Sequence, residues 1–279
     1  MGLITCQVEH VRFGPLCSQR VDLVPRVSVV IPAKNEGSNI DPVLRRISED
    51  VTLDFECLIV VDDEKDSTAT FLDENWGNDG RFRIVVNHGE RGPSWAIRAG
   101  IDSAQSPVVV VTMADGSDDP RVIDLLTKLV ERGVVVAAAS RYMPGGQQVG
   151  ASGLKGRMSR WAGKSLAAFA KVGTKDATNS FKAYDVSFVR EVGIESKHGF
   201  EIGLELTAKA HRLGKPVAEI PTIWLERDVG KSNFKLKEWL PHYLAWYALA
   251  FGRPLEPAEL AKQTAKWQRR KSRFVKDSS

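Results

Sequence analysis

The sequence predicts an α/β fold in which a mostly parallel sheet is flanked by helices. From Val27 onward, short β-branched runs alternate with longer amphipathic stretches, which is the pattern of βαβ units. Polar clusters follow three of these runs, and ligands of such sheets bind beyond the carboxyl ends of the strands. The predicted strands are the apolar runs Val27 to Ile31, Cys57 to Val61, Arg83 to Val86, Val108 to Thr112 and Val134 to Ala138.

The stretches between these strands predict helices, because each is long enough to cross back over a sheet. These helices are Ile40 to Glu49, Ser67 to Glu74, Ser94 to Ser103 and Arg121 to Glu131. The alternation then stops, and the glycine-rich stretch from Arg141 to Gly156 is expected to form a flexible loop over the site. Further helices are expected at about Met158 to Lys171 and Glu201 to Leu213, with a strand pair around Val217 to Glu226.

Size and composition indicate one large domain with appendages. The chain has 279 residues, of which 43% are hydrophobic, enough for a sizeable core. We expect an N-terminal extension at 1–25, the main domain at 26–233, and a C-terminal helix with a basic tail at 234–279. The formal net charge of +4 is spread along the chain, which argues against a nucleic-acid partner.

The sequence shows no sign of export. Cys6, Cys17 and Cys57 lack metal-ligand spacing and are odd in number, which favours a reducing compartment. Residues 1–9 lack the basic and apolar segments of a secretory signal, so a cytoplasmic protein is expected. The apolar stretch at 243–251 is far shorter than the roughly 20 residues that span a bilayer, so any membrane contact is expected to be peripheral.

The segment from Phe234 to Phe251 is rich in aromatic residues. Trp239, Tyr243, Trp246 and Tyr247 are of the types that gather at a bilayer interface, where an interfacial helix would lie. The same pattern fits packing on the protein's own core or on a partner subunit, and periodicity does not separate these alternatives. The basic tail at 269–276 would attract anionic lipid or remain solvated.

Three carboxylates, Asp115, Asp118 and Asp119, follow the strand predicted at Val108 to Thr112. Several carboxylates at a strand end are typical of a site for a hard cation held by oxygen ligands. An aspartate just before Pro120 is also a good helix start, and Asp119 is interpreted mainly as an N-cap. We expect Asp115 to bind a metal or a diphosphate, while Asp118 fits either that role or the cap.

Two other polar clusters end predicted strands. A carboxylate of Asp62 or Asp63 would accept a hydrogen bond from the base of a nucleotide, or would polarise the turn and cap the helix that begins near Ser67. Pro32 to Glu36 is either part of a ligand site or an ordinary loop that leads to Ser38 as an N-cap.

In order and spacing, the three clusters resemble those of family 2 glycosyltransferases: a Pro-x-x-Asn-Glu start at Pro32, a Val-Asp-Asp turn at Val61, and an acidic metal motif. The later motifs resemble those of the dolichol-phosphate mannose synthase group. These are Ser140-Arg-Tyr-Met-Pro-Gly-Gly146, Met158-Ser-Arg160, Asp176-Ala-Thr-Asn-Ser-Phe181, Gly199-Phe200 with Glu205, and Arg227-x-x-Gly-Lys-Ser232. The resemblance covers about 27–244 and implies a GT-A fold, the Rossmann-like fold of nucleotide-diphospho-sugar transferases.

The resemblance implies a nucleotide-sugar donor and a divalent metal ion. Asp115, together with Asp118, would bind the Mg²⁺ or Mn²⁺ that bridges the donor diphosphate, and both aspartates are the catalytic candidates. The residues that would hold the donor nucleotide are Pro32, Glu36, Asp63, Ala114 and Asp115.

The resemblance also implies a phosphate-bearing acceptor. Arg141 and Arg160 match arginines that contact the acceptor phosphate, and Arg227 and Lys231 match a basic element near both phosphates. A planar guanidinium binds phosphate through two parallel hydrogen bonds. The alternative for each arginine is a solvated surface ion pair.

Two positions depart from the family pattern. Met113 replaces the first carboxylate of the Asp-x-Asp motif, and a thioether does not replace a carboxylate as a ligand for Mg²⁺ or Mn²⁺. Either Asp115 and Asp118 share the ion with the diphosphate and water, or metal dependence is weak. Asn179-Ser180-Phe181 replaces the family's Ser-Gly-Phe and adds a side chain where glycine allows close packing. The acceptor can differ accordingly from that of the family.

The implied reaction is an inverting transfer of a sugar from a UDP- or GDP-sugar to a polyprenyl phosphate at the cytoplasmic membrane face. The metal and the basic groups would neutralise the leaving diphosphate. A phosphate acceptor is already ionised, whereas a hydroxyl acceptor would need a base, with Asp118 or Asp176 as candidates. The alternatives are a soluble transferase for a small-molecule or polysaccharide-precursor acceptor, and an impaired nucleotide-sugar-binding subunit, suggested by Met113. A homo-oligomer is compatible with the sequence.

Overall fold

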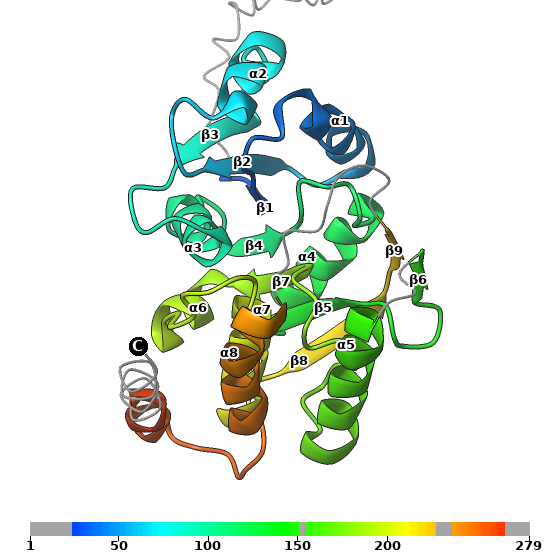
Figure 1. The fold of residues 1–279 in the computed structure, drawn as a ribbon, viewed down its shortest axis with the longest axis vertical. Helices are drawn as coiled ribbons and strands as arrows, with labels where there is room; N and C mark the ends of the chain where they lie inside the picture. Colours follow the sequence, from blue (N-terminus) through cyan, green and yellow to red (C-terminus); the bar gives the residue numbers. More distant parts are fainter. Residues whose placement is uncertain (1–23, 151–153, 227–235, 266–279) are drawn as a thin grey trace, which may run out of the picture.

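The fold is a seven-stranded sheet between layers of helices (Figure 1). The computed structural model describes residues 24–150, 154–226 and 236–265. The strand order is β3-β2-β1-β4-β7-β5-β8, with β7 antiparallel to both of its neighbours and the other strands mutually parallel. The mostly parallel α/β sheet expected from the sequence is therefore confirmed. The strands are β1 (Val27–Pro32), β2 (Phe55–Val61), β3 (Phe82–Val86), β4 (Val108–Val111), β5 (Val136–Ser140), β7 (Lys182–Asp185) and β8 (Val217–Pro221).

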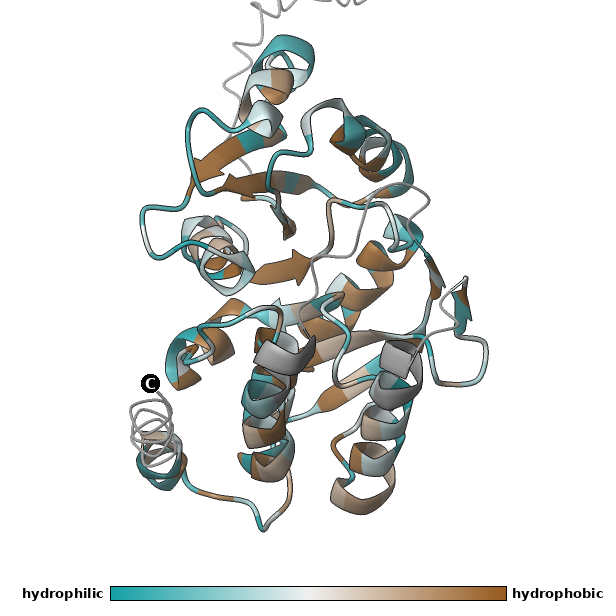
Figure 2. Ribbon diagram, in the orientation of Figure 1, coloured by the Kyte–Doolittle hydropathy of each residue, from teal (hydrophilic) through white to brown (hydrophobic). Residues whose placement is uncertain are grey.

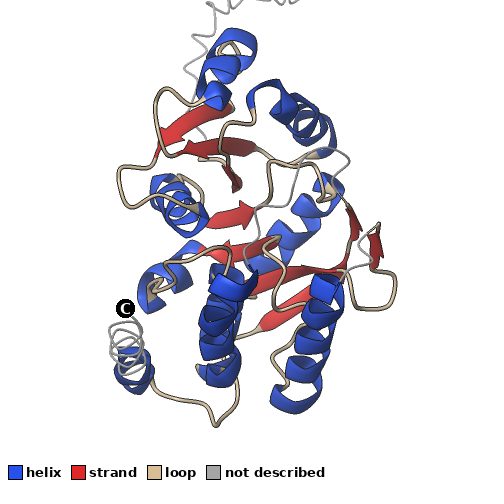
Figure 3. Cartoon of the chain, viewed as in Figure 1, coloured by secondary structure: helices blue, strands red, loops and turns tan. Residues whose placement is uncertain are grey.

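Helices cover both faces of this sheet, as Figure 3 shows. One face packs against α1 (Asp41–Asp50), α2 (Ser67–Trp76) and α4 (Ile123–Glu131). The other face packs against α3 (Pro93–Ser103), α6 (Val186–Val192) and α7 (Ile202–Arg212). Because the central strands are buried on both sides, they are apolar along most of their length, as Figure 2 shows.

A third, smaller core lies on the outer side of α7. It joins α7 to α8 (Leu236–Leu249) and to the π-helical turn Leu166–Ala170 that ends α5 (Leu154–Ser165). Trp246 is 4% exposed in this core, and Tyr243 and Tyr247 pack partly buried against it. For these three aromatic residues the structure shows packing on the protein's own core rather than an interfacial position.

The last strands differ from the expected arrangement. The strand pair predicted around Val217 to Glu226 is wrong, because β8 pairs with β5 while β9 (Ile223–Leu225) pairs with β6 (Gln147–Val149). The strand β6 lies inside the segment predicted to be a flexible loop. The division into 1–25, 26–233 and 234–279 stays a prediction, and the basic tail at 269–276 lies outside the described residues.

Candidate functional site

The candidate site lies at the carboxyl edge of the sheet, between β1 and β4. β1 forms hydrogen bonds with β2 on one side and with β4 on the other. The chain leaves β1 toward β2 and leaves β4 toward β5, so the two connections run toward opposite edges of the sheet. Such a switch in strand order is where open α/β sheets bind ligands.

The loop after β1 is fixed by a residue that the sequence analysis did not single out. The carboxylate of Asp66 accepts the backbone N–H of Asn35 at 2.9 Å and caps α2 by accepting that of Thr68 at 2.8 Å. The hydroxyl of Thr68 accepts the backbone N–H of Glu36 at 3.0 Å. The cap expected of Asp62 or Asp63 is therefore made by Asp66, whose place directly before Ser67 is a recognisable N-cap signal.

The two aspartates after β2 have different surroundings. Asp62 accepts the backbone N–H of Gly92 at 3.1 Å and the side-chain amide of Asn87 at 2.8 Å, so it holds the connection from β3 to α3. Asp63 is exposed at the rim, and its nearest basic group is Arg91 at 3.4 Å. Of the two, Asp63 is the one with a carboxylate accessible to a nucleotide, as the resemblance implies.

Pro32 and Glu36, the other predicted donor residues of this region, flank the same loop. Pro32 is the buried last residue of β1, and Glu36 is partly buried. Ser38 is not an N-cap, because it lies inside the short helix at Gly37–Ile40, which has no side-chain cap. The loop is thus shaped by Asp66 and Thr68 from the neighbouring helix.

The acidic loop after β4 turns one carboxylate inward and leaves the other near its surface. Asp118 is buried, and its Oδ2 accepts the hydroxyl of Thr112 at 2.9 Å and the backbone N–H of Met113 at 3.3 Å. Asp115 is partly exposed, and its Oδ1 accepts the backbone N–H of Ser117 at 3.0 Å. Asp118 therefore stabilises the loop that presents Asp115.

Asp119 has the capping role expected from the sequence. Its Oδ1 accepts the backbone N–H of Arg121 at 3.2 Å at the start of the 3-10 turn Pro120–Val122. Arg46 on α1 lies 3.8 Å from the same carboxylate and donates to the carbonyl of Gly116 at 3.4 Å. Ala114, the remaining donor candidate, is buried within the loop.

The electrostatics of the acidic loop favour a nearby positive charge. Burial, followed by the negative charge of Asp115, raises the pKa of Asp118 to about 7. The hydrogen bond from Thr112 and the charge of Arg141 act in the opposite direction. A cation beside the two carboxylates would favour the ionised form of both.

Asp115 and Asp118 fit a cation that is shared with a ligand. Within the described ranges, no group of three or more His, Cys, Asp or Glu side chains forms a ligand cluster, and Met113 adds only a thioether. Mg²⁺ is commonly held by one or two carboxylates, with substrate phosphates and water completing the shell. The residues therefore fit a divalent ion on a diphosphate better than a metal held by protein alone.

Arg141, directly after β5, is held by a buried carboxylate. Its Nε and Nη2 donate to Asp176 at 2.7 and 2.8 Å, and its backbone N–H donates to the same group at 3.0 Å. Burial opposes the charge of Arg141, but the hydrogen bonds and charge of Asp176 outweigh it and raise the pKa of the guanidinium. Arg141 is therefore a charged, rigidly oriented arginine rather than a solvated one.

The turn that carries Asp176 rests on a buried lysine that the sequence analysis missed. Lys182 on β7 donates from Nζ to the carbonyl oxygens of Asp176 at 3.3 Å, Ala177 at 3.1 Å, and Asn179. Burial lowers the pKa of Lys182 to about 7, which the charge of Asp176 opposes. Lys182 thus holds the turn through its carbonyl oxygens, and the turn in turn positions Asp176, which binds Arg141.

The two predicted acceptor arginines share one aromatic ring. The guanidinium carbons of Arg141 and Arg160 lie 4.9 and 5.3 Å from the ring centroid of Tyr142. The hydroxyl of Tyr142 forms a hydrogen bond with Ser159 Oγ at 3.2 Å, and Ser159 Oγ forms a second hydrogen bond with Thr178 Oγ1 at 2.7 Å. The structure thus brings Arg141 and Arg160 together. The other two acceptor candidates, Arg227 and Lys231, lie outside the described residues.

Glu205, which is part of the resemblance, has a structural role. It is fully buried on α7, accepts the backbone N–H groups of Glu195 and Ser196 at 2.7 and 2.8 Å, and pairs with Lys209 at 2.7 Å. These contacts hold the segment before α7 in place. None of these contacts involves the acidic loop or the arginine pair.

Comparisons with known sequences identify the family of this chain. The model of the family "Glycosyl transferase family 2" matches residues 28–193. An undecaprenyl-phosphate mannosyltransferase of Micrococcus luteus is 29% identical over 222 residues, covering 75% of this chain and 87% of that protein. A dolichol-phosphate mannosyltransferase of Pyrococcus furiosus is 30% identical over 223 residues, covering 78% of this chain and 62% of that protein.

Solved structures share the fold. A glucosyl-3-phosphoglycerate synthase from Mycobacterium tuberculosis, in complex with Mn²⁺, UDP and glucosyl-3-phosphoglycerate, aligns with a TM-score of 0.61 at 19% identity over 83% of this chain and 82% of that chain. The mannosyltransferase PcManGT from Pyrobaculum calidifontis, in complex with GDP-Man and Mn²⁺, aligns with a TM-score of 0.59 at 18% identity over 84% of this chain and 66% of that chain. With the family model matched over more than half of its length, the chain belongs to glycosyl transferase family 2, has the GT-A fold and resembles the dolichol-phosphate mannose synthases.

Proposed function

We propose that this protein transfers a sugar from a UDP- or GDP-sugar to a polyprenyl phosphate with inversion at the anomeric carbon. The observation that supports this most is that the positive charge of Arg141, which the buried Asp176 holds in place, acts on Asp118 in the acidic loop. This arrangement offers one site for a metal-bound diphosphate and an adjacent one for a second phosphate. The names of the curated relatives, which include a polyprenol monophosphomannose synthase of Mycolicibacterium smegmatis, support the same acceptor class.

On the donor side, Pro32, Glu36, Asp63 and Ala114 would surround the nucleotide at the switch point of the sheet. Asp115 and Asp118 would hold Mg²⁺ or Mn²⁺, which when bound supplies positive charge for the leaving nucleoside diphosphate. Asp118 keeps the loop in shape through Thr112, so Asp115 is the carboxylate presented to the ligand. Groups that are fixed before the reaction stabilise developing charge at little reorganisation cost.

On the acceptor side, Arg141 and Arg160 would bind the lipid phosphate, joined by Arg227 and Lys231. A phosphate is already ionised near neutral pH, so the acceptor needs orientation rather than a general base. Asp176 and Tyr142 restrict the two guanidinium groups to one region. The polyprenyl chain of such an acceptor resides in a bilayer, which implies peripheral contact with a membrane. No described helix is long and apolar enough to cross one.

A hydroxyl-bearing acceptor is a second candidate, because burial raises the pKa of Asp118 to about 7. A carboxylate with a pKa near the working pH suits a general base. In that case Asp118 would take the proton of the hydroxyl, and the substrate would be a small molecule or a polysaccharide precursor.

The test is release of nucleoside diphosphate from a panel of UDP- and GDP-sugars, with and without Mg²⁺ or Mn²⁺. Each donor is offered to a short polyprenyl phosphate, to the matching polyprenol, and to no acceptor. Release that needs the lipid phosphate and a metal is the expected result and identifies the donor. Release with the polyprenol but not with the polyprenyl phosphate would support a hydroxyl-bearing acceptor, as in the second candidate. Donor binding without any turnover would indicate a nucleotide-sugar-binding subunit.

A further inference from the structure

Two buried basic side chains are attached to one short turn, residues 176–179. Arg141 binds both carboxylate oxygens of Asp176, and this ion pair leaves 10% of the arginine side chain and none of the aspartate side chain exposed. Lys182 is fully buried and donates to the backbone carbonyl of Asp176 at 3.3 Å and to two further carbonyls of the same turn. When Lys182 is protonated, the three side chains together carry two positive charges and one negative charge.

The ion pair alone would attract a phosphate only weakly. Asp176 orients Arg141, but its negative charge also cancels most of the arginine's field at a third group. A protonated Lys182 returns a net positive charge to the three side chains. Asp118 also acts on both basic groups, but it belongs to the acidic loop, where its charge is expected to face a metal ion.

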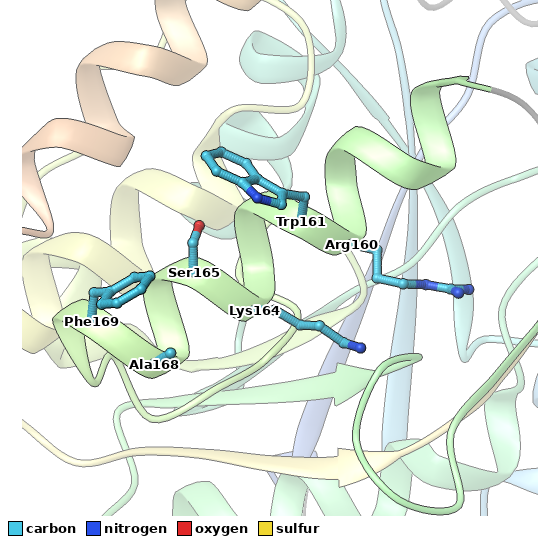
Figure 4. A pocket seen from close by; sticks show the side chains of 6 residues that line it. All are labelled: Arg160, Trp161, Lys164, Ser165, Ala168 and Phe169. Atoms are coloured by element: carbon cyan, nitrogen blue, oxygen red, sulfur yellow. The ribbon is translucent and has the colours of Figure 1, made fainter.

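Arg160 brings positive charge to the candidate acceptor site from the surface. Figure 4 shows it extending from α5 on the side of the helix away from Trp161 and Phe169. Because Arg160 is exposed, water and salt screen its charge, whereas the buried Lys182 is screened much less. At equal distance, the buried charge therefore acts more strongly on a bound anion.

The charges around Lys182 determine how readily it holds a proton. Its pKa is lowered to about 7, because burial, the largest effect, and the charge of Arg141 outweigh the charges of Asp176 and Asp118. Near neutral pH the lysine is therefore poised between its two forms. An anion brought close to it would favour the protonated form.

The helix α7 covers Lys182 with a glycine. A Cβ on Gly203 would lie 3.3 Å from Lys182 Nζ and 2.9 Å from a carbonyl oxygen of the turn, so a larger residue would press on both. The hydroxyl of Tyr184 lies 3.6 Å from the same point, and burial raises its pKa and keeps it neutral. Glu205, a carboxylate on α7, is paired with Lys209 at 2.7 Å.

We propose that Lys182 is a positioning residue of the acceptor site, which holds the turn of Asp176 and supplies the net positive charge that lets Arg141 bind the acceptor phosphate. The inference rests on the proposed acceptor class and adds a residue that does not itself touch the acceptor. Binding of the phosphate and protonation of Lys182 would favour each other, with the proton taken from solvent.

The experiment is isothermal titration calorimetry of the full chain with a short polyprenyl phosphate, without donor. Lys182→Met removes the charge and leaves an apolar side chain of similar length, a change that buried sites often tolerate. At about pH 7 it is expected to weaken binding on the order of tenfold. Lys182→Arg keeps a charge and hydrogen-bond donors, and it is expected to bind within about threefold of the unsubstituted protein.

The pH profile separates a charged role of Lys182 from a purely structural one. As pH rises from about 6 to about 8, the lysine loses its proton, whereas an arginine at this position stays charged. The affinity of the unsubstituted protein, divided by that of Lys182→Arg, is therefore expected to fall over this range. Ionisation of the phosphate itself affects both proteins alike and cancels in the ratio.

Two matched controls change buried polar side chains that do not contact the turn. Lys209→Met removes a lysine that is 1% exposed and donates to two backbone carbonyls at 3.2 and 2.9 Å. Tyr184→Phe removes a buried hydroxyl from the strand that carries Lys182. Both are expected to bind the polyprenyl phosphate as the unsubstituted protein does. Urea unfolding checks that each variant folds, and Tyr184→Phe remains as the control if Lys209→Met does not.

Three results would overturn the proposal. In the first, Lys182→Met binds as tightly as the unsubstituted protein at about pH 7. In the second, the folded controls lose as much affinity as Lys182→Met, so that the loss follows from any change in the interior. In the third, the affinity ratio to Lys182→Arg does not vary with pH, so that the charge of Lys182 does not act on the phosphate.

Failure of this inference and failure of the proposed reaction give different results. If the polyprenyl phosphate binds in a way that depends on Lys182 but no nucleoside diphosphate is released, the transfer reaction is excluded and the role of Lys182 stands. If the lipid phosphate stimulates release while Lys182→Met binds it normally, the reaction stands and the role of Lys182 is excluded.

Discussion

Asp115 and Asp118 lie three residues apart but have different surroundings. One carboxylate oxygen of Asp115 accepts the backbone N–H of Ser117, whereas Asp118 is buried and accepts the hydroxyl of Thr112. The variant Asp115→Asn keeps the size of the side chain and an oxygen for Ser117 but removes the charge. We expect nucleoside diphosphate release to fall by about 100-fold or more, since a group that stabilises developing charge is lost. Thermal unfolding is expected to be unchanged.

The matched control for Asp115 is Asp119→Asn, which changes the neighbouring cap instead. An asparagine caps a helix start about as well as an aspartate does. Product release by this variant is therefore expected to be close to that of the unsubstituted protein. If both variants were equally active, Asp115 would have no part in the reaction.

Arg141 and Arg160 are predicted to act on the same acceptor but to differ in their effect on stability. Arg141→Ala leaves the charge of Asp176 buried without its partner, and it is expected to lower the free energy of unfolding by about 3–5 kcal/mol. Arg160 is exposed, so Arg160→Ala is expected to change this free energy by less than about 0.5 kcal/mol. Urea unfolding measures both values.

Kinetics complete that comparison. Arg160→Ala is expected to raise the KM for the polyprenyl phosphate far more than the KM for the nucleotide sugar, and it is the cleaner test because the protein stays folded. Equal effects on the two substrates would contradict a role at the acceptor phosphate. If Arg141→Ala were as stable as the unsubstituted protein, the ion pair with Asp176 would not hold the turn.

At the residue scale, the sequence predicted the positions that carry a motif but not those that support it. Asp115 and Arg141 follow strands in a recognisable pattern, so they could be named in advance. Asp66 acts through a contact with Asn35, which lies on another loop. Lys182 contacts the turn just before it in the chain, but it is hidden in a strand that was not predicted. Only Asp66 had a local signal, its place before Ser67.

At the element scale, two helices place tryptophan in opposite environments. Trp246 on α8 is 4% exposed within the third core, while Trp161 on α5 is 69% exposed. Trp246→Ala is expected to lower the free energy of unfolding by about 3–5 kcal/mol, through lost burial and the cavity left behind. Trp161→Ala is expected to change it by less than about 0.5 kcal/mol. A similar loss for both variants in urea unfolding would contradict the inward orientation of α8.

The same contrast explains which elements could be predicted. The βα units up to β5 have apolar runs and helices of ordinary length, and the sequence located each of them within a few residues. β6 is a three-residue strand, Gln147–Val149, with little apolar character, and its partner β9 is almost eighty residues later. Such pairing depends on tertiary contacts, so local sequence does not reveal it.

At the scale of the whole molecule, the donor and acceptor candidates lie in different halves of the sheet. The donor candidates lie after β1, β2 and β4, and the described acceptor candidates lie after β5 and on α5. The third core fastens α8 to this second half, where Arg212 of α7 donates to the carbonyl oxygens of Leu249 and Arg253 at 2.7 and 2.9 Å. Because the sheet that joins the two halves is closely packed, we expect its strands to keep their positions when the loops at its edge bind ligands.

This division predicts where ligands slow hydrogen exchange. With a nucleotide sugar and Mg²⁺, we expect protection at 33–39, 62–66 and 113–119, because the donor contacts the loops after β1, β2 and β4. Addition of a polyprenyl phosphate is expected to extend protection to 141–149 and to the helix α5. Strands β1, β2 and β4 are expected to be protected before any ligand is added, since they are buried on both faces. Protection first at the opposite edge of the sheet, or at 141–149 with the donor alone, would contradict the assignment of donor and acceptor to separate halves.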